Sequence, residues 1–204
     1  MTPAALASSL EQNALVALGH CVHEGKTLVL IGPDEPSFWP HFTASPEYRD
    51  GAPDPLDRWS LRVLDGIAAD IGATPVYPFG GPPFHPFHTW AVRSGRFWAS
   101  PIGFLVHDTA GLFASFRGAL ILEAAWPAVT GSNPCLTCPD RPCATACPVG
   151  AFGDGYDVAA CKTHVASPEG VVCLTDGCRA RRACPVGQDR RLSEQAAFHM
   201  KAFL

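Results

Sequence analysis

Fifty residues, from Cys135 to Cys184, constrain this chain more than any other part of it. They contain eight of its nine cysteines: Cys135, Cys138, Cys143, Cys147, Cys161, Cys173, Cys178 and Cys184. The order is a group of four, then an isolated cysteine, then a group of three. The group of four and the group of three both end in the same tetrapeptide, Cys-Pro-Val-Gly. Thiols are rarely gathered so densely without a common partner, so this segment must fold around whatever the cysteines bind.

Closely spaced cysteines that end in Cys-Pro are typical of ferredoxins, which hold iron–sulfur clusters with short loops. In two-cluster ferredoxins the last cysteine of a run binds the other cluster, so eight thiolates form two four-cysteine sites. The sequence therefore predicts two [4Fe–4S] clusters in a loop-rich region. The gaps Cys138–Cys143 and Cys173–Cys178 each hold four residues where the bacterial pattern holds two, which predicts bulged loops.

Three other interpretations of the cysteines are weaker. Structural zinc also uses four cysteines at short spacings. A disulfide framework needs an oxidising compartment, but residues 1–19 contain no Lys or Arg and lack the charged start of a signal peptide. Inert buried thiols are the least favoured interpretation. We therefore expect a cytoplasmic protein whose cysteines bind iron.

The composition narrows the classes of partner. The 204 residues suit one domain or two small ones, and the hydrophobic content of 47% permits a core. No apolar run reaches the 18 residues of a membrane-spanning helix. Residues 1–131 hold 7 basic and 12 acidic side chains, and residues 132–204 hold 8 and 7, so neither part has a strongly basic face. We expect no membrane and no nucleic acid as partner.

The most basic run is Arg179, Arg181 and Arg182, between two cysteines. These side chains can offset the negative charge of a thiolate-bound cluster. We favour that role over a patch that docks a partner, which is the alternative.

Apolar patterns predict the first elements. Leucines and alanine at a spacing of four predict a helix over residues 3–19, with Gly19 as its stop. Residues 26–32 form a short continuous apolar run, which predicts a buried strand at the centre of a sheet. Residues 36–53 are rich in Pro and aromatic side chains and predict a loop with a short helix.

The clearest helix begins at Asp54-Pro55, where Asp54 can cap and Pro55 suits the first turn, and ends at Gly72. Strands are expected over residues 74–77, 102–106 and 118–122. This order of strands and helices predicts an α/β (α+β) sheet domain.

The segment Gly131-Ser132-Asn133-Pro134 predicts a hinge. It divides the chain into a sheet domain, residues 1–131, and a bacterial-ferredoxin-like two-cluster domain, residues 132–204. The second domain is expected to close with a short amphipathic helix from Ser193.

Two positions and one loop outside the cysteine-rich region have mainly structural interpretations. Cys21 lies between His20 and His23, but no third ligand is adjacent, and free cysteine is usually a buried residue. His107 taken alone is more often a satisfied structural histidine. The loop of residues 78–90 combines Gly-Gly, prolines and aromatic rings. It can line a pocket for a planar ligand, although composition alone favours a packing loop.

The cysteine region resembles the ferredoxin-like part of the epoxyqueuosine reductase and reductive dehalogenase superfamily, which has eight cysteines in this order. The resemblance covers about a third of the chain. Ferredoxin precedent assigns the cysteines to two clusters. One is held by Cys135, Cys138, Cys143 and Cys184, and the other by Cys147, Cys161, Cys173 and Cys178.

The upstream part is similar to the cobalamin-binding domain of that superfamily and to cobalamin-processing (CblC-type) domains. The similarity rests on His107, Gly111 and the pair Arg117-Gly118. It implies cobalamin as a possible cofactor, in an aromatic pocket bordered by Phe79, Gly80, Phe84 and His107. The chain shows no basic surface for tRNA, so we do not expect activity on queuosine tRNA.

Three functions follow, in order of preference. The first is an iron–sulfur electron-transfer protein that exchanges single electrons with a redox partner protein or a bound small-molecule cofactor. The second is a corrinoid-dependent reductase or B12-processing enzyme that receives electrons from the clusters. The third is a zinc-stabilised binding module. The sequence leaves open whether the protein is an enzyme, a possible oxidoreductase.

Overall fold

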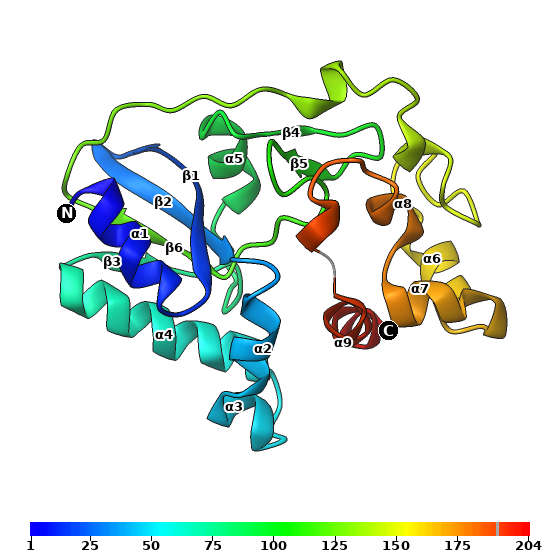
Figure 1. The fold of residues 1–204 in the computed structure, drawn as a ribbon, viewed down its shortest axis with the longest axis horizontal. Coiled ribbons are helices and arrows are strands. Elements are labelled where there is room, and N and C mark those ends of the chain that lie inside the picture. Colours follow the sequence, from blue (N-terminus) through cyan, green and yellow to red (C-terminus); the bar gives the residue numbers. More distant parts are fainter. Residues whose placement is uncertain (191) are drawn as a thin grey trace. The chain divides into compact units, whose positions relative to one another are not determined.

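The structure is a computed structural model that describes residues 1–190 and 192–204 (Figure 1). These residues form two compact units. The sheet unit comprises residues 1–97 and 114–131, and the cysteine unit comprises residues 98–113 and 132–204. A boundary falls between Gly131 and Ser132, in the segment where the sequence predicts a hinge. Residues 98–113, expected in the first domain, belong instead to the cysteine unit, because their apolar side chains pack among the cysteines.

The sheet unit is built on a four-stranded antiparallel sheet with the order β1-β2-β6-β3. Its strands are β1 (Leu15–His23), β2 (Lys26–Pro33), β3 (Thr74–Val76) and β6 (Gly118–Leu122). The central position predicted for β2 is confirmed, and its residues from Thr27 to Pro33 are all buried. The mixed α and β class is also confirmed.

The long first helix predicted over residues 3–19 is wrong in its second half. Helix α1 (Pro3–Glu11) ends early, Ala14 takes a left-handed backbone (φ 51°), and β1 follows. The cause is a hairpin with β2, whose turn residues Glu24 and Gly25 have φ values of 50° and 79°. Two consecutive left-handed residues match the twist of paired strands. Strand pairing therefore overrides the helical spacing of the leucines.

Two short helices, α2 (Phe38–Thr43) and α3 (Pro46–Arg49), occupy the region where a loop with one short helix was expected. Helix α4 (Pro55–Ile71) follows where predicted and ends at the left-handed Gly72. The expected cap by Asp54 is absent. Its backbone is left-handed (φ 51°) rather than extended, so its side chain makes no capping hydrogen bond.

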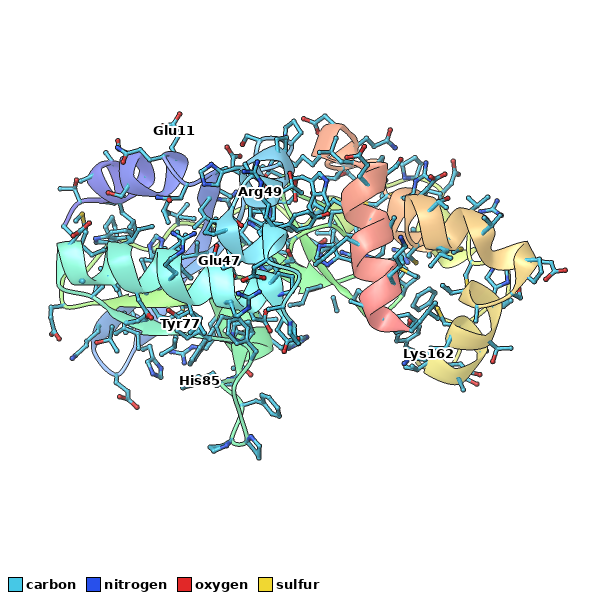
Figure 2. All side chains as sticks on the ribbon, turned by 90° about the horizontal axis from the view of Figure 1, so that it is seen from below. Glu11, Glu47, Arg49, Tyr77, His85 and Lys162 are labelled. Carbon is cyan, nitrogen blue, oxygen red and sulfur yellow. The ribbon has the colours of Figure 1, made fainter. Side chains whose placement is uncertain are left out.

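Helix α4 packs along β3 and β6 with one apolar face. At its first turns, Trp59 meets Phe38 edge to face, with ring centroids 5.3 Å apart. Glu47 on α3, labelled in Figure 2, is buried and accepts hydrogen bonds from the Arg62 guanidinium on α4, one of them 3.0 Å long. This pairing lowers the pKa of Glu47 and joins α3 to α4.

The loop expected over residues 78–90 ends earlier, because its last four residues belong to helix α5 (Phe87–Arg93), which contacts β1. The cysteine unit has little regular structure. Its strands are β4 (Phe97–Ala99) and β5 (Leu105–His107), and β4 begins at Phe97, the boundary residue of the sheet unit. Its helices are α6 (Val158–Val165), α7 (Val171–Asp176), α8 (Arg179–Arg182) and α9 (Ser193–Phe203). Four 3₁₀ turns lie among them: η1 (Pro134–Leu136), η2 (Pro142–Ala144), η3 (Pro168–Gly170) and η4 (Gln188–Arg190).

The strand expected over residues 102–106 is shifted toward the C-terminus. Residues 100–104 form a turn, in which the Phe104 carbonyl accepts the Ser100 amide at 2.9 Å and Gly103 is left-handed. The C-terminal helix expected from Ser193 is present as α9 and packs on α7. Lys162 of α6, labelled in Figure 2, lies over the Phe203 ring at 5.2 Å. Within the described residues, none of the helices has the length and apolar character needed to cross a membrane.

We predict that the stability of the sheet unit depends on the buried face of α4. Leu64 is fully buried, and a Cβ added at Gly118 of β6 would come within 2.5 Å of its Cδ1. Leu64→Ala should lower the free energy of unfolding by about 2–5 kcal/mol, through lost burial and a cavity. Leu61→Ala, at a site 38% exposed on the same helix, should cost less than about 1 kcal/mol. Urea denaturation followed by circular dichroism measures both, and equal losses would contradict the packing described.

Candidate metal centre

The eight clustered cysteines form two groups of four. The first group, Cys135, Cys138, Cys143 and Cys184, lines one cavity together with Val106 and Leu112. The second group comprises Cys147, Cys161, Cys173 and Cys178. Burial raises the pKa of Cys173, and the thiols of Cys161 and Cys147 raise it further; burial also raises the pKa of Cys178, and Cys161 adds to that rise. The lining of the cavity and these mutual effects are compatible with the two sets of four that ferredoxin precedent assigns, and the assignment itself stays a prediction. All nine cysteines are free thiols.

Two tight turns and a distant loop assemble the first group. The Asn133 side chain accepts the Cys135 amide at 3.0 Å and starts η1. Cys143 sits in η2, which follows the left-handed Arg141. Cys184 arrives from the far end of the region, after α8. Burial raises the pKa of Cys143, and the thiols of Cys135 and Cys184 raise it further. Four such thiols ionise together only when a cation compensates them.

The second group lies on and beside three short helices. Cys161 is in α6, Cys173 is in α7, and Cys178 precedes α8. Backbone amides point at several sulfurs. The Ala151 amide donates to the Cys147 Sγ at 3.4 Å. Burial raises the pKa of Cys178, while the amides of Arg181 and Ala180 oppose that rise. Amide donors of this kind stabilise a thiolate over a thiol.

The loop of residues 107–111 supports the first group. His107 and Gly111 exchange two backbone hydrogen bonds, of 2.9 and 3.0 Å, which close the loop. Gly111 is left-handed (φ 59°), and a Cβ there would lie 2.3 Å from the Val186 carbonyl oxygen and 3.3 Å from the Cys184 Sγ. At the left-handed Gly187, a Cβ would come within 2.8 Å of the Ala110 backbone. Glycine thus lets the two loops approach closely enough to hold Cys184 in place.

His107 is fixed by its own loop. Its ring is buried, and Nδ1 accepts the amides of Ala110 and Thr109 at 3.1 and 3.3 Å. Its Nε2 lies 3.3 Å from an Asp108 carboxylate oxygen. With both ring nitrogens engaged, His107 has the structural role that its isolated position in the sequence favours.

The residues expected to border a corrinoid pocket are divided between the units, with Phe79, Gly80 and Phe84 in the sheet unit and His107 in the cysteine unit. Phe79 stacks on Tyr77 at 5.3 Å, Gly80 is left-handed, and Phe84 is 66% exposed. The corrinoid pocket stays a prediction.

The pair Arg117-Gly118 leads into β6 of the sheet unit. Burial lowers the pKa of Arg117 to about 10, and Asp57 lies 4.0 Å from its guanidinium. Cys21 is a buried residue of β1 in the same unit and belongs to neither group.

Sequence reasoning missed an aromatic group beside the second set of cysteines. Tyr156 stacks on Phe152 at 4.9 Å and meets Phe104 edge to face at 5.3 Å. Its hydroxyl lies near Cys161. Burial, followed by hydrogen bonding to Cys161, raises the pKa of Tyr156, so the hydroxyl stays protonated. No motif marks this tyrosine, because its role depends on packing between segments far apart in the sequence.

The basic run has one member that points inward. Arg181 is partly buried: its Nε donates to the Leu112 carbonyl at 2.7 Å, and its guanidinium lies over the Phe113 ring at 4.8 Å. Burial lowers the pKa of Arg181, whereas the nearby Cys178 opposes that shift. Arg181 therefore places a positive charge beside the second group.

Among residues 1–190 and 192–204, no three His, Cys, Asp or Glu side chains stand where they could hold one metal ion together. Two sulfurs on a single tetrahedral zinc lie only about 3.8 Å apart, given its Zn–S bond length.

In the comparison with known proteins, no family model, curated protein or solved structure matches this chain.

We predict that Gly111→Ala releases metal from the first group, because its methyl group would collide with Val186 and crowd Cys184. Gly103→Ala is the matched control: Gly103 is also left-handed (φ 78°) and in the same unit, but nothing lies within 4 Å of its added Cβ. Both variants carry the backbone strain, of about 1 kcal/mol. Iron content after anaerobic purification should fall by about half for Gly111→Ala only. Equal losses would show that strain, not the contact with Cys184, matters.

Proposed function

We propose that this protein transfers single electrons through two [4Fe–4S] clusters. The observation that carries the proposal is the division of eight thiols into two groups of four, with Cys147 and Cys184 each joining the group at the other end of the region. An exchange of the Cys-Pro cysteines is the arrangement of two-cluster ferredoxins.

The residues present fit such clusters in their chemistry. Each group offers only sulfur donors, which soft iron–sulfur centres prefer over the oxygen ligands of hard cations. The cavity of the first group is walled by apolar side chains, including Val106 and Leu112, which limit access of water. When bound, such clusters accept and return one electron at a time.

The chain's own residues would set the reduction potentials of the clusters. Added electrons make a thiolate-bound centre more negative, so positive charges and hydrogen-bond donors favour the reduced state. Arg181 supplies such a charge near Cys178, and the Ala151 amide supplies such a donor to Cys147. Tyr156 supplies a further donor to Cys161.

Metal analysis and cysteine variants test the proposal. Anaerobically purified protein should contain about eight irons per chain, whereas stoichiometric zinc or no metal would overturn the proposal. Cys147→Ser should alter the electron paramagnetic resonance signal of the centre held by Cys173 and Cys178, since Cys147 belongs to that group. Cys21→Ser is the control and should leave iron content unchanged. If Cys147→Ser damages only the centre held by Cys135, the assignment of cysteines is wrong.

We predict that Tyr156→Phe lowers the reduction potential of the second centre while iron content stays constant. The substitution removes the hydroxyl donor to Cys161 and keeps the ring that packs on Phe152. Tyr77→Phe is the control, because the Tyr77 hydroxyl bonds Asp65 in the sheet unit. Redox titration followed by electron paramagnetic resonance measures both. An unchanged potential in Tyr156→Phe would show that this hydrogen bond does not tune the centre.

A further inference from the structure

A hollow of about 480 Å³ opens on the cysteine unit, lined by Ala146, Val172, Arg179, Arg182 and Ala183. Four of these five residues are sequence neighbours of a clustered cysteine. Ala146 precedes Cys147, Val172 precedes Cys173, Arg179 follows Cys178, and Ala183 precedes Cys184. The hollow therefore lies where the chain that carries both groups of cysteines reaches the surface.

The short helix α8 divides the three arginines of the basic run between two directions. Arg179 and Arg182 are three residues apart, a spacing that puts two side chains on the same face of a helix. Both are exposed and line the hollow. Arg181 points instead to Leu112 and Phe113 inside the unit. Arg181 is thus the arginine of this helix that packs inside the unit, while Arg179 is exposed and still acts electrostatically on Cys173.

The outer arginines make this surface locally positive. Arg182 lies 3.4 Å from Asp176, an ion pair between two partly exposed side chains, which contributes little stability and is screened by salt. Arg179 adds a second positive charge at the same rim. The chain as a whole carries a net charge of −4, so attraction for anions depends on such local sites.

Apolar side chains accompany these charges. Val172 in the hollow is 44% exposed, and its neighbour Val171 is 52% exposed. Protein interfaces combine an apolar centre with a charged rim, and charge complementarity steers the encounter. A small anion needs no apolar wall, so the combination fits a macromolecular partner better.

We propose that this hollow docks an acidic redox partner protein, which places carboxylates on Arg179 and Arg182 and apolar side chains on Val172. The inference rests on the proposed electron-transfer function and adds where electrons leave or enter. Docking here brings the partner next to residues bonded to the cysteines of both groups, so the path through protein is short.

The first test measures binding without electron transfer. Fluorescein-labelled poly-L-glutamate is the probe, and fluorescence anisotropy reports its complex with the cluster-loaded protein at low salt. Arg179→Gln/Arg182→Gln should weaken binding about tenfold, within the range that a few local charges produce. Arg49→Gln is the matched control for Arg179→Gln, because Arg49 is an exposed arginine in the sheet unit, and it should change binding less than twofold (Figure 2). Equal effects of Arg179→Gln and Arg49→Gln on binding would overturn the proposal.

The second test asks whether electrons pass at this surface. Reduced protein is mixed in a stopped-flow instrument with hexacyanoferrate(III), which takes one electron and becomes hexacyanoferrate(II), or with cationic hexaammineruthenium(III). Arg179→Gln/Arg182→Gln should slow oxidation by the anion about tenfold and leave the rate with the cation unchanged or faster. Unchanged rates with both oxidants would place the exit elsewhere.

Iron content and electron paramagnetic resonance, measured first on each variant, separate the two proposals. A wild-type protein without clusters overturns the electron-transfer function and the docking site together. Intact clusters with rates and binding that ignore Arg179 and Arg182 overturn the docking site alone.

Discussion

Mutual repulsion among thiolates is the constraint on which the cysteine unit depends. Four sulfurs that face one cavity cannot all ionise unless a positive centre holds them, and burial raises the cost. The chain meets this constraint twice. Each group combines cysteines from both ends of the region, since Cys184 joins Cys135 and Cys147 joins Cys173. A segment with so little regular structure is thereby closed on itself, and under the proposed function metal binding and folding of this unit are one process.

The loop of residues 107–111 extends that dependence to a segment far upstream. Gly111 and Gly187 allow backbone contact that any side chain would prevent, so the Cys-Pro-Val-Gly turn at Cys184 rests on a loop about 75 residues earlier in the chain. The apolar residues of that segment, Val106 and Leu112, complete the wall of the first group. The cysteine unit is thus discontinuous in sequence.

The elements that could be predicted are those whose signals are local. The apolar run of β2, the capping pattern that ends α4 at Gly72, and the amphipathic spacing of α9 all depend on neighbouring residues. The second half of the predicted first helix failed because pairing with β2 is a longer-range effect than the spacing of the leucines. The assignment of the cysteines to two clusters stays a prediction from their order, whereas the packing of Tyr156 against Phe104 depends on tertiary structure that no local pattern encodes.

The structure separates the three arginines of the basic run, which the sequence treats as one group. The sequence favoured one role for all three arginines, compensation of cluster charge, over the alternative of a patch that docks a partner. A single helical turn allows two directions, because Arg179 and Arg182, three residues apart, share a face that Arg181 does not. Arg181 turns inward, where burial and the Leu112 carbonyl fix its guanidinium, and Arg179 and Arg182 turn outward beside the exposed Val172. The same four-residue helix therefore packs one arginine inside the unit and exposes two at its surface, and the exposed Arg179 still acts electrostatically on Cys173.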